Sequence, residues 1–177
     1  MRTDEFWALI EAARATPGDS EEITERVISA LADRPAEEIL AFDRHLHRVL
    51  VASYREDLWG AAYLINGGAS DDDFAHFRGW LMAQGRAVFA RAVAEPDSLA
   101  ELPAVQRAAL TGAEFGAPAM ARFAAEAYRR ATGEDPPVEE GRAAYPDLND
   151  FWDFDDEEEA RRRLPRLAAL FLEPPQE

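Results

Sequence analysis

The chain has no cysteine and no lysine, and these two absences exclude more functions than any motif adds. Without cysteine there are no disulfides, no thiolate nucleophiles and no sulfur-rich zinc sites. Without lysine there is no phosphate-binding lysine of a P-loop, no Schiff-base lysine and no kinase lysine. All 19 basic residues are arginine, a composition that a GC-rich genome tends to encode, so mutational bias is the simplest explanation.

Positive charge is also scarce, since the formal net charge is −16. Binding a polyanion needs a basic face that displaces counterions, so nucleic acid is excluded as a partner. The acidity is local: residues 134–159 hold twelve acidic side chains and one arginine, a net charge of −11. We therefore treat the negative charge as a property of one region.

Long apolar runs are missing as well. The chain has no stretch of roughly 18 apolar residues and no basic N-terminal region followed by an apolar segment, so we expect neither a membrane span nor a secretory signal. A length of 177 residues with 47% hydrophobic residues suits one domain with a complete core. The expected location is the cytoplasm.

The residues that are present predict an all-α fold, either a helical bundle or an orthogonal helical array. Alanine, leucine, arginine and glutamate dominate, and apolar residues recur at spacings of three and four. Breaking and capping residues predict a long central helix over 71–94. They also predict helices from 3 or 4 to about 16, from 19 or 20 onward, from 35 to about 53, over 55–65, over 98–110 and over 117–131.

The region after residue 133 has a different character. Residues 138–155 show no helical period but contain Tyr145, Phe151, Trp152 and Phe154. These are too many rings for a solvated tail, so we expect an irregular acidic C-terminal arm with its rings inserted into the helical body. A last helix over 156–171 is interrupted at Pro165. The predicted organisation is a helical body, 1–133, with the acidic aromatic arm and C-terminal helix, 134–177, packed on the same domain.

The segment 59–85 concentrates chemistry more than any other. Asn66, Gly67 and Gly68 predict a helix stop, because glycine and asparagine adopt the left-handed conformation of a C-terminal cap. Ser70 and Asp73 then fit a capping box at the next helix start. The three consecutive aspartates from Asp71 also fit a site for a hard cation, but neighbouring helical residues point about 100° apart. Capping is the preferred interpretation.

Three further side chains on this helix are candidates for a ligand site. Asp72 and His76 are four residues apart and share a helix face, where a carboxylate raises the imidazole pKa and can form an acid–base pair. Arg78 follows. The rings nearby are interpreted either as core or as the wall of a pocket. The candidate ligand-binding or partner-binding residues are Trp59, Tyr63, Asp72, His76, Arg78 and Trp80.

The order of these residues resembles the signature of a known family. The run Trp59-Gly-Ala-Ala-Tyr-Leu-Ile-Asn-Gly-Gly-Ala-Ser-Asp-Asp-Asp-Phe-x-x-Phe-Arg-x-Trp-Leu81, followed by Asp97-Ser-Leu99, is similar to the bacterial domain-of-unknown-function family DUF4240. The N-terminal Phe6-Trp7 and the C-terminal Tyr145-Pro146 and Arg163-Leu-Pro-Arg-Leu167 are also similar, so the resemblance covers most of the chain. The cysteine associated with the position after Gly-Gly is Ala69 here, so a thiol mechanism is not implied. The resemblance implies a soluble bacterial protein without an established activity, with a regulatory or interaction role, and it transfers no catalytic residues.

Two functional hypotheses follow. The first is a non-catalytic cytoplasmic binding domain for a protein or small molecule, with the acidic arm or the Trp59–Arg78 region as its recognition surface. The alternative is an enzyme or small-ligand binder, such as a metal-assisted hydrolase, that uses Asp72, His76 and Arg78. We expect no cofactor and no resident metal, and Asp72 and His76 are the residues that would bind one in the alternative.

Overall fold

A computed structural model describes residues 2–148 and 151–173. Across these ranges the chain forms helices and no strand, which confirms the all-α prediction. None of the helices described is both long and apolar enough to cross a membrane. The elements are α1 (Thr3–Arg14), α2 (Ser20–Ala32), α3 (Ala36–Ala52), α4 (Glu56–Asn66), α5 (Asp71–Ala83), α6 (Arg86–Ala94), η1 (Pro96–Glu101), α7 (Pro103–Thr111), η2 (Met120–Arg122), α8 (Phe123–Thr132), α9 (Glu157–Arg163) and α10 (Pro165–Phe171).

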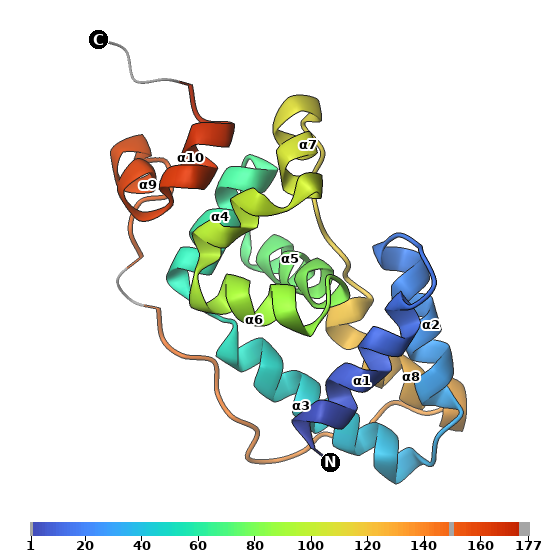
Figure 1. Ribbon diagram of the computed structural model, residues 1–177. Coiled ribbons are helices and arrows are strands. Elements are labelled where there is room, and N and C mark those ends of the chain that lie inside the picture. Colours follow the sequence, from blue (N-terminus) through green and yellow to red (C-terminus); the bar gives the residue numbers. More distant parts are fainter. Residues whose placement is uncertain (1, 149–150, 174–177) are drawn as a thin grey trace.

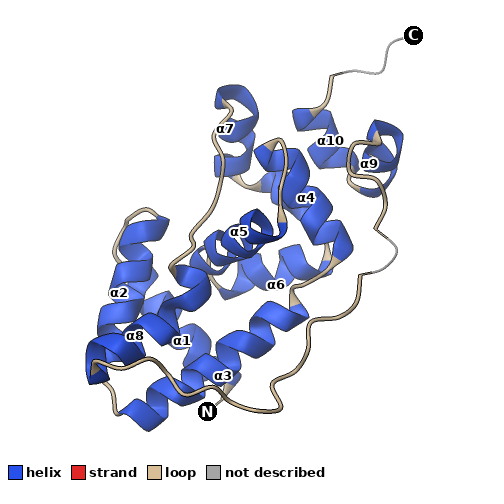
Figure 2. Ribbon diagram, turned by 180° about the vertical axis from the view of Figure 1, so that it is seen from behind, coloured by secondary structure: helices blue, strands red, loops and turns tan. Residues whose placement is uncertain are grey.

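The helices α5 and α6 lie in the middle of the molecule (Figures 1 and 2). At one end α1, α2, α3 and α8 pack together, and at the other α4, α7, α9 and α10 do so. One continuous cluster of buried side chains joins the two ends, from Phe6 and Leu31 through Phe77 to Leu167. Burial of this apolar surface is the main stabilising term of such a fold.

The long helix predicted over 71–94 is wrong, because the chain breaks at Gln84 and Gly85 into α5 and α6. Gly85 has a φ of 92°, a backbone conformation that glycine adopts at little cost. The carboxylate of Glu11 on α1 accepts a hydrogen bond from the N–H of Arg86 at 2.9 Å, which caps the start of α6. Both helices bury apolar residues in the same core, so the apolar spacing runs across the break.

Two other predicted helices are also divided. The predicted helix over 98–110 is η1 followed by α7, and Pro103 occupies the first turn of α7, where its missing N–H costs nothing. The predicted helix over 117–131 begins as the short η2 before α8. The predicted break at Pro165 is confirmed, since it separates α9 from α10.

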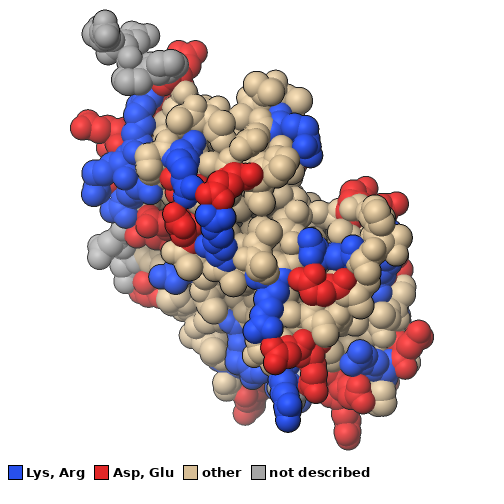
Figure 3. Space-filling view, viewed as in Figure 1, with Lys and Arg blue, Asp and Glu red and all other residues tan. Residues whose placement is uncertain are grey.

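Charged side chains connect neighbouring helices over the surface. Arginines and acidic residues interleave on the face shown in Figure 3. Arg166 of α10, for example, pairs with Glu95 and Glu101, and Glu101 also holds Arg91. The carboxylate of Asp97 is more buried and accepts the backbone N–H groups of Arg166 and Leu167 at 3.0 and 2.9 Å. Asp97 therefore caps α10 from another element.

The ion pair between Glu25 of α2 and Arg130 of α8 predicts a pH-dependent stability. Both nitrogens of the Arg130 fork bond this carboxylate, at 2.5 and 2.9 Å, which lowers the pKa of Glu25 to about 2. Its contribution is present above the unfolded value of 4.5 and is lost as the pH falls towards about 2. Glu25→Gln should lower the melting temperature at pH 7, and this effect should shrink as the pH falls to about 2.

Glu21→Gln is the matched control, since Glu21 lies one turn earlier on α2 and is exposed. Because both members of the Glu25–Arg130 pair are well exposed, the effect should be small and should shrink in high salt. Thermal denaturation followed by circular dichroism measures it. A Glu25→Gln effect that stays constant from pH 7 to pH 2 would contradict the assignment.

Candidate functional site

The arm comprises residues 134–155, and its described residues, 134–148 and 151–155, cross the molecule as extended segments between α8 and α9 (Figures 1 and 2). In the described residues it contains no helix or strand. It passes along α3 and then across α4, the helix that carries Trp59 and Tyr63. The acidic arm and the Trp59–Arg78 region, the two candidate recognition surfaces, thus lie against each other.

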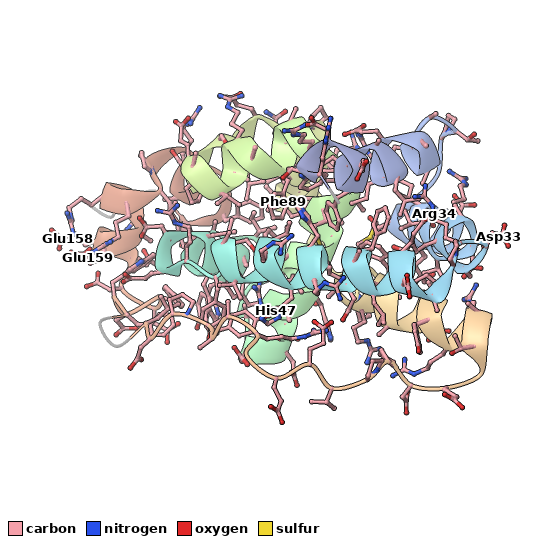
Figure 4. All side chains as sticks on the ribbon, turned by 90° about the horizontal axis from the view of Figure 1, so that it is seen from below. Asp33, Arg34, His47, Phe89, Glu158 and Glu159 are labelled. Atoms are coloured by element: carbon pink, nitrogen blue, oxygen red, sulfur yellow. The ribbon has the colours of Figure 1, made fainter. Side chains whose placement is uncertain are left out.

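The first part of the arm is held by polar side chains of α3. Arg44 bonds Glu139 at 2.7 Å, and Arg142 of the arm bonds Asp43. His47 points from α3 towards the arm (Figure 4), and its Nε2–H donates to the carbonyl of Ala143 at 2.7 Å. These contacts hold residues 139–143 of the arm against α3, just before Tyr145 meets Arg78 of α5.

Arg78 of α5 lies beside this part of the arm and is only 3% exposed. Its Nη1 donates to the carbonyl of Leu50 in the last turn of α3 at 2.6 Å. The guanidinium also lies over the rings of Phe74, Tyr54 and Tyr145, at 4.6, 5.1 and 5.6 Å from their centroids. Burial lowers the pKa of Arg78, yet an arginine keeps its charge. The negative end of α3 and three ring faces stabilise this cation in place of a carboxylate.

The second part of the arm is anchored by Trp152, which is 7% exposed. Its backbone N–H donates to Glu56 at 2.6 Å and its indole N–H to Asp57 at 3.2 Å. The indole ring lies directly over Gly60 of α4, where an added Cβ would come within 2.4 Å of a ring carbon. Glycine inside a helix is destabilising, but here it forms a notch that only the absence of a side chain provides.

Other rings continue this surface. Trp59 stacks on Phe74, with ring centroids 4.8 Å apart, and meets the edge of Phe151 at 5.0 Å. The hydroxyl of Tyr63 donates to Asp155 at 2.5 Å, a hydrogen bond that raises the pKa of Tyr63. A shallow, apolar hollow of about 430 Å³ lies between these α4 rings and residues 151–155. We call the surface of α3, α4 and the start of α5 that the arm contacts the arm groove. It is formed by Asp43, Arg44, His47, Tyr54, Glu56, Asp57, Trp59, Gly60, Tyr63 and Arg78.

The structure does not bring Asp72, His76 and Arg78 into one cavity. Asp72 is exposed, and Arg78 reaches α3. His76 is half-buried in a separate hollow of about 450 Å³ beside Gly116. Positions 76 and 78 are turned about 200° apart around the helix axis. In the described part of the chain, no three acidic or histidine side chains are placed to hold a metal ion.

Trp80 also lies away from the arm groove. It is 5% exposed and stacks on Phe115 with centroids 4.3 Å apart. Asn66 holds the same loop, because its side-chain amide bonds both the N–H and the carbonyl of Phe115, at 2.9 and 3.0 Å. Asn66 therefore acts as a tether for this loop in addition to ending α4.

The expected capping residues form regular helix ends. Gly67 ends α4 with a φ of 69°, and Gly68 follows with a φ of 135°. The hydroxyl of Ser70 accepts the N–H of Asp73 at 3.2 Å, and the Asp73 carboxylate accepts the N–H of Ser70 at 3.0 Å. The Ser70 hydroxyl donates to the Asp73 carboxylate at 2.7 Å, and this bond, together with the bond from the Ser70 N–H, lowers the pKa of Asp73.

The sequence interpretation missed Gly60, His47, Tyr54 and the acceptor pair at the start of α4. One signal was present for Gly60: an isolated glycine inside a helical apolar run often marks a close approach. The partners of Tyr54 and His47 carry no such signal, because both depend on where the arm crosses the helices. Residues that contact a segment roughly 90 positions away in sequence leave no local pattern.

Comparison with known proteins gives one match. The sequence profile of a family described as "Protein of unknown function (DUF4240)" matches residues 1–130, which confirms the resemblance seen in the sequence. No curated protein and no solved structure matches the chain. The matched range contains α3, α4 and α5 and ends inside α8, so it includes the arm groove and excludes the arm.

The notch predicts that Gly60→Ala destabilises the fold when Trp152 is present and stabilises it when Trp152 is replaced by alanine. In the wild type the added methyl group would expel the Trp152 ring, and the lost burial should destabilise the fold by about 2–3 kcal/mol. In a Trp152→Ala background the same change should stabilise α4 by about 0.5–1 kcal/mol, since alanine is the better helix former. Urea denaturation of the four proteins measures this double-mutant cycle. Equal effects of Gly60→Ala in both backgrounds would contradict the notch.

Arg78 predicts a second measurable effect. Arg78→Lys keeps the charge but loses the planar fork that bonds the Leu50 carbonyl while lying on the rings, so we expect a loss of about 1–3 kcal/mol. Arg86→Lys is the control, because Arg86 is an exposed surface arginine. Urea denaturation distinguishes the two. Similar small effects for both variants would show that the geometry around Arg78 contributes little.

Proposed function

The chain belongs to the DUF4240 family, and we propose that its matched body is a cytoplasmic, non-catalytic binding domain for an extended polypeptide segment rich in aromatic and acidic residues. The proposed binding surface is the arm groove. One observation carries the proposal: a segment of that composition, the chain's own arm, lies in the groove although it is outside the family-matched range. The arm would then be the intramolecular occupant of a recognition surface.

The groove has the chemistry that such recognition needs. A deep aromatic anchor commonly supplies most of the binding energy of an interface, and the Gly60 notch accepts an indole ring. Glu56 accepts the backbone N–H of the Trp152 anchor, and Asp57 accepts its indole N–H. The Arg78 cation lies beneath the ring of Tyr145 and favours an electron-rich face at that position.

The geometry supports the enzyme alternative less well. Asp72, His76 and Arg78 would have to act on one substrate, and Arg78 is buried against α3 while Asp72 is exposed. A small-ligand site would have to use the hollow beside His76 with Asp73 and Glu114 instead. This arrangement differs from the constellation expected from the sequence, so binding of a polypeptide segment is the function we favour.

A peptide-binding experiment tests the proposal on the full chain. The probe is a fluorescein-labelled synthetic peptide with the sequence of residues 142–156, followed by fluorescence anisotropy. In the wild type the tethered arm competes at an effective concentration in the millimolar range. Trp152→Ala weakens that competitor, so this variant should bind the peptide at least about tenfold more tightly than the wild type. Phe154→Ala serves the same purpose if Trp152→Ala does not fold.

Two variants control this result. Adding Gly60→Val to Trp152→Ala fills the notch and should abolish peptide binding. Val138→Ala changes an arm residue that is 96% exposed, so its affinity should equal that of the wild type. Folding of each variant is checked by circular dichroism. The proposal fails if the peptide binds none of the folded proteins, or binds equally well with the notch filled.

A further inference from the structure

We infer that the arm groove also accepts the arm of a second copy of the chain, which produces an arm-exchanged dimer. The inference rests on the proposed function, since it names one partner for the same groove. The occupant seen in the structure is this chain's own segment, so a second copy presents the same Trp152 anchor, the same Tyr145 ring and the same Arg142. Exchange therefore replaces each intramolecular contact by an identical intermolecular one.

The arm is attached in a way that permits exchange. Among the described residues, no backbone–backbone hydrogen bond joins the arm to a helix of the body. Side chains hold it: the ion pairs of Arg44 with Glu139 and of Arg142 with Asp43, the bonds from His47 and Tyr63, and the acceptors of Trp152 on α4. Release of the arm therefore breaks no ladder of main-chain hydrogen bonds, and the helices of the body keep their own.

The start of the arm favours an extended path. Gly133 ends α8 with a φ of 77°, and Pro136-Pro137 follow. Proline fixes its φ near −65° and disfavours helix in the residue before it, so the segment resists folding back into a compact turn. The ion pair at the start of the arm, Asp135 with Arg129, is mostly exposed and so is a weak restraint.

Concentration decides between the two arrangements. Because the tether gives intramolecular docking an effective concentration in the millimolar range, the wild-type chain should be monomeric at micromolar concentration. Two copies with a net charge of −16 also repel each other, and salt screens this repulsion. Exchange should therefore become dominant when docking within one chain is blocked.

A complementary pair of full-length variants creates that condition. Gly60→Val leaves an intact arm with no groove to receive it, and Trp152→Ala leaves an open groove without its anchor. Mixed at about 100 µM, well below the effective concentration of an intact tether, the two should form a one-to-one dimer in size-exclusion chromatography with light scattering. In it the arm of the Gly60→Val chain occupies the groove of the Trp152→Ala chain, which is one of the two intermolecular contacts of the exchanged dimer. Each alone should stay monomeric. Phe154→Ala replaces Trp152→Ala if the latter does not fold.

The control mixture contains Gly60→Val and Val138→Ala. The second chain then keeps its own arm in its groove, so this mixture should remain monomeric. A complementary mixture that stays monomeric, while the peptide still binds Trp152→Ala, overturns the exchange and leaves the proposed function intact. Failure of peptide binding as well removes both. A dimer found only in the complementary mixture supports the exchange.

Discussion

The fold depends on charged side chains that satisfy the open ends of neighbouring helices. A chain of short helices exposes many unpaired N–H and carbonyl groups, since each helix leaves four of each. Glu11 closes the start of α6, and Asp97 closes the start of α10. Arg26 donates to the carbonyls of Ala13 and Thr16 at the end of α1, and Arg78 does so at the end of α3. Each such contact also sets the position of one helix relative to another.

The absence of lysine has a structural counterpart in these contacts. A guanidinium carries several donors in a planar fork, can bond a carbonyl and lie on a ring at once, and keeps its charge when buried. Arg78 uses all three properties. A lysine ammonium is a compact, strongly hydrated charge and would lose more on burial. The composition that mutational bias explains is thus one that this packing exploits.

A feature could be predicted from the sequence when the residues that produce it are close together in the chain. The Ser70–Asp73 box closes within one turn and was readable, as was the break at Pro165. The break at Gly85 was not, because the apolar spacing continues through it and the carboxylate that caps the start of α6 comes from α1. The bond from Arg78 to the Leu50 carbonyl depends on how α5 packs against α3, which no local pattern shows. The aromatic arm was expected to insert its rings, but the notch that receives them became visible only when α4 and the arm were placed together.

Gly60 and Trp152 lie on opposite sides of the boundary of the family match. A side chain at position 60 would collide with the Trp152 ring, and a glycine there without the ring only weakens α4, so the two positions should change together over evolution even though only Gly60 lies in the family-matched range. A relative with a larger residue at the glycine position has no room for an indole ring against α4. A relative that keeps the glycine but lacks an arm would carry an open notch, and its ring would have to come from a different molecule.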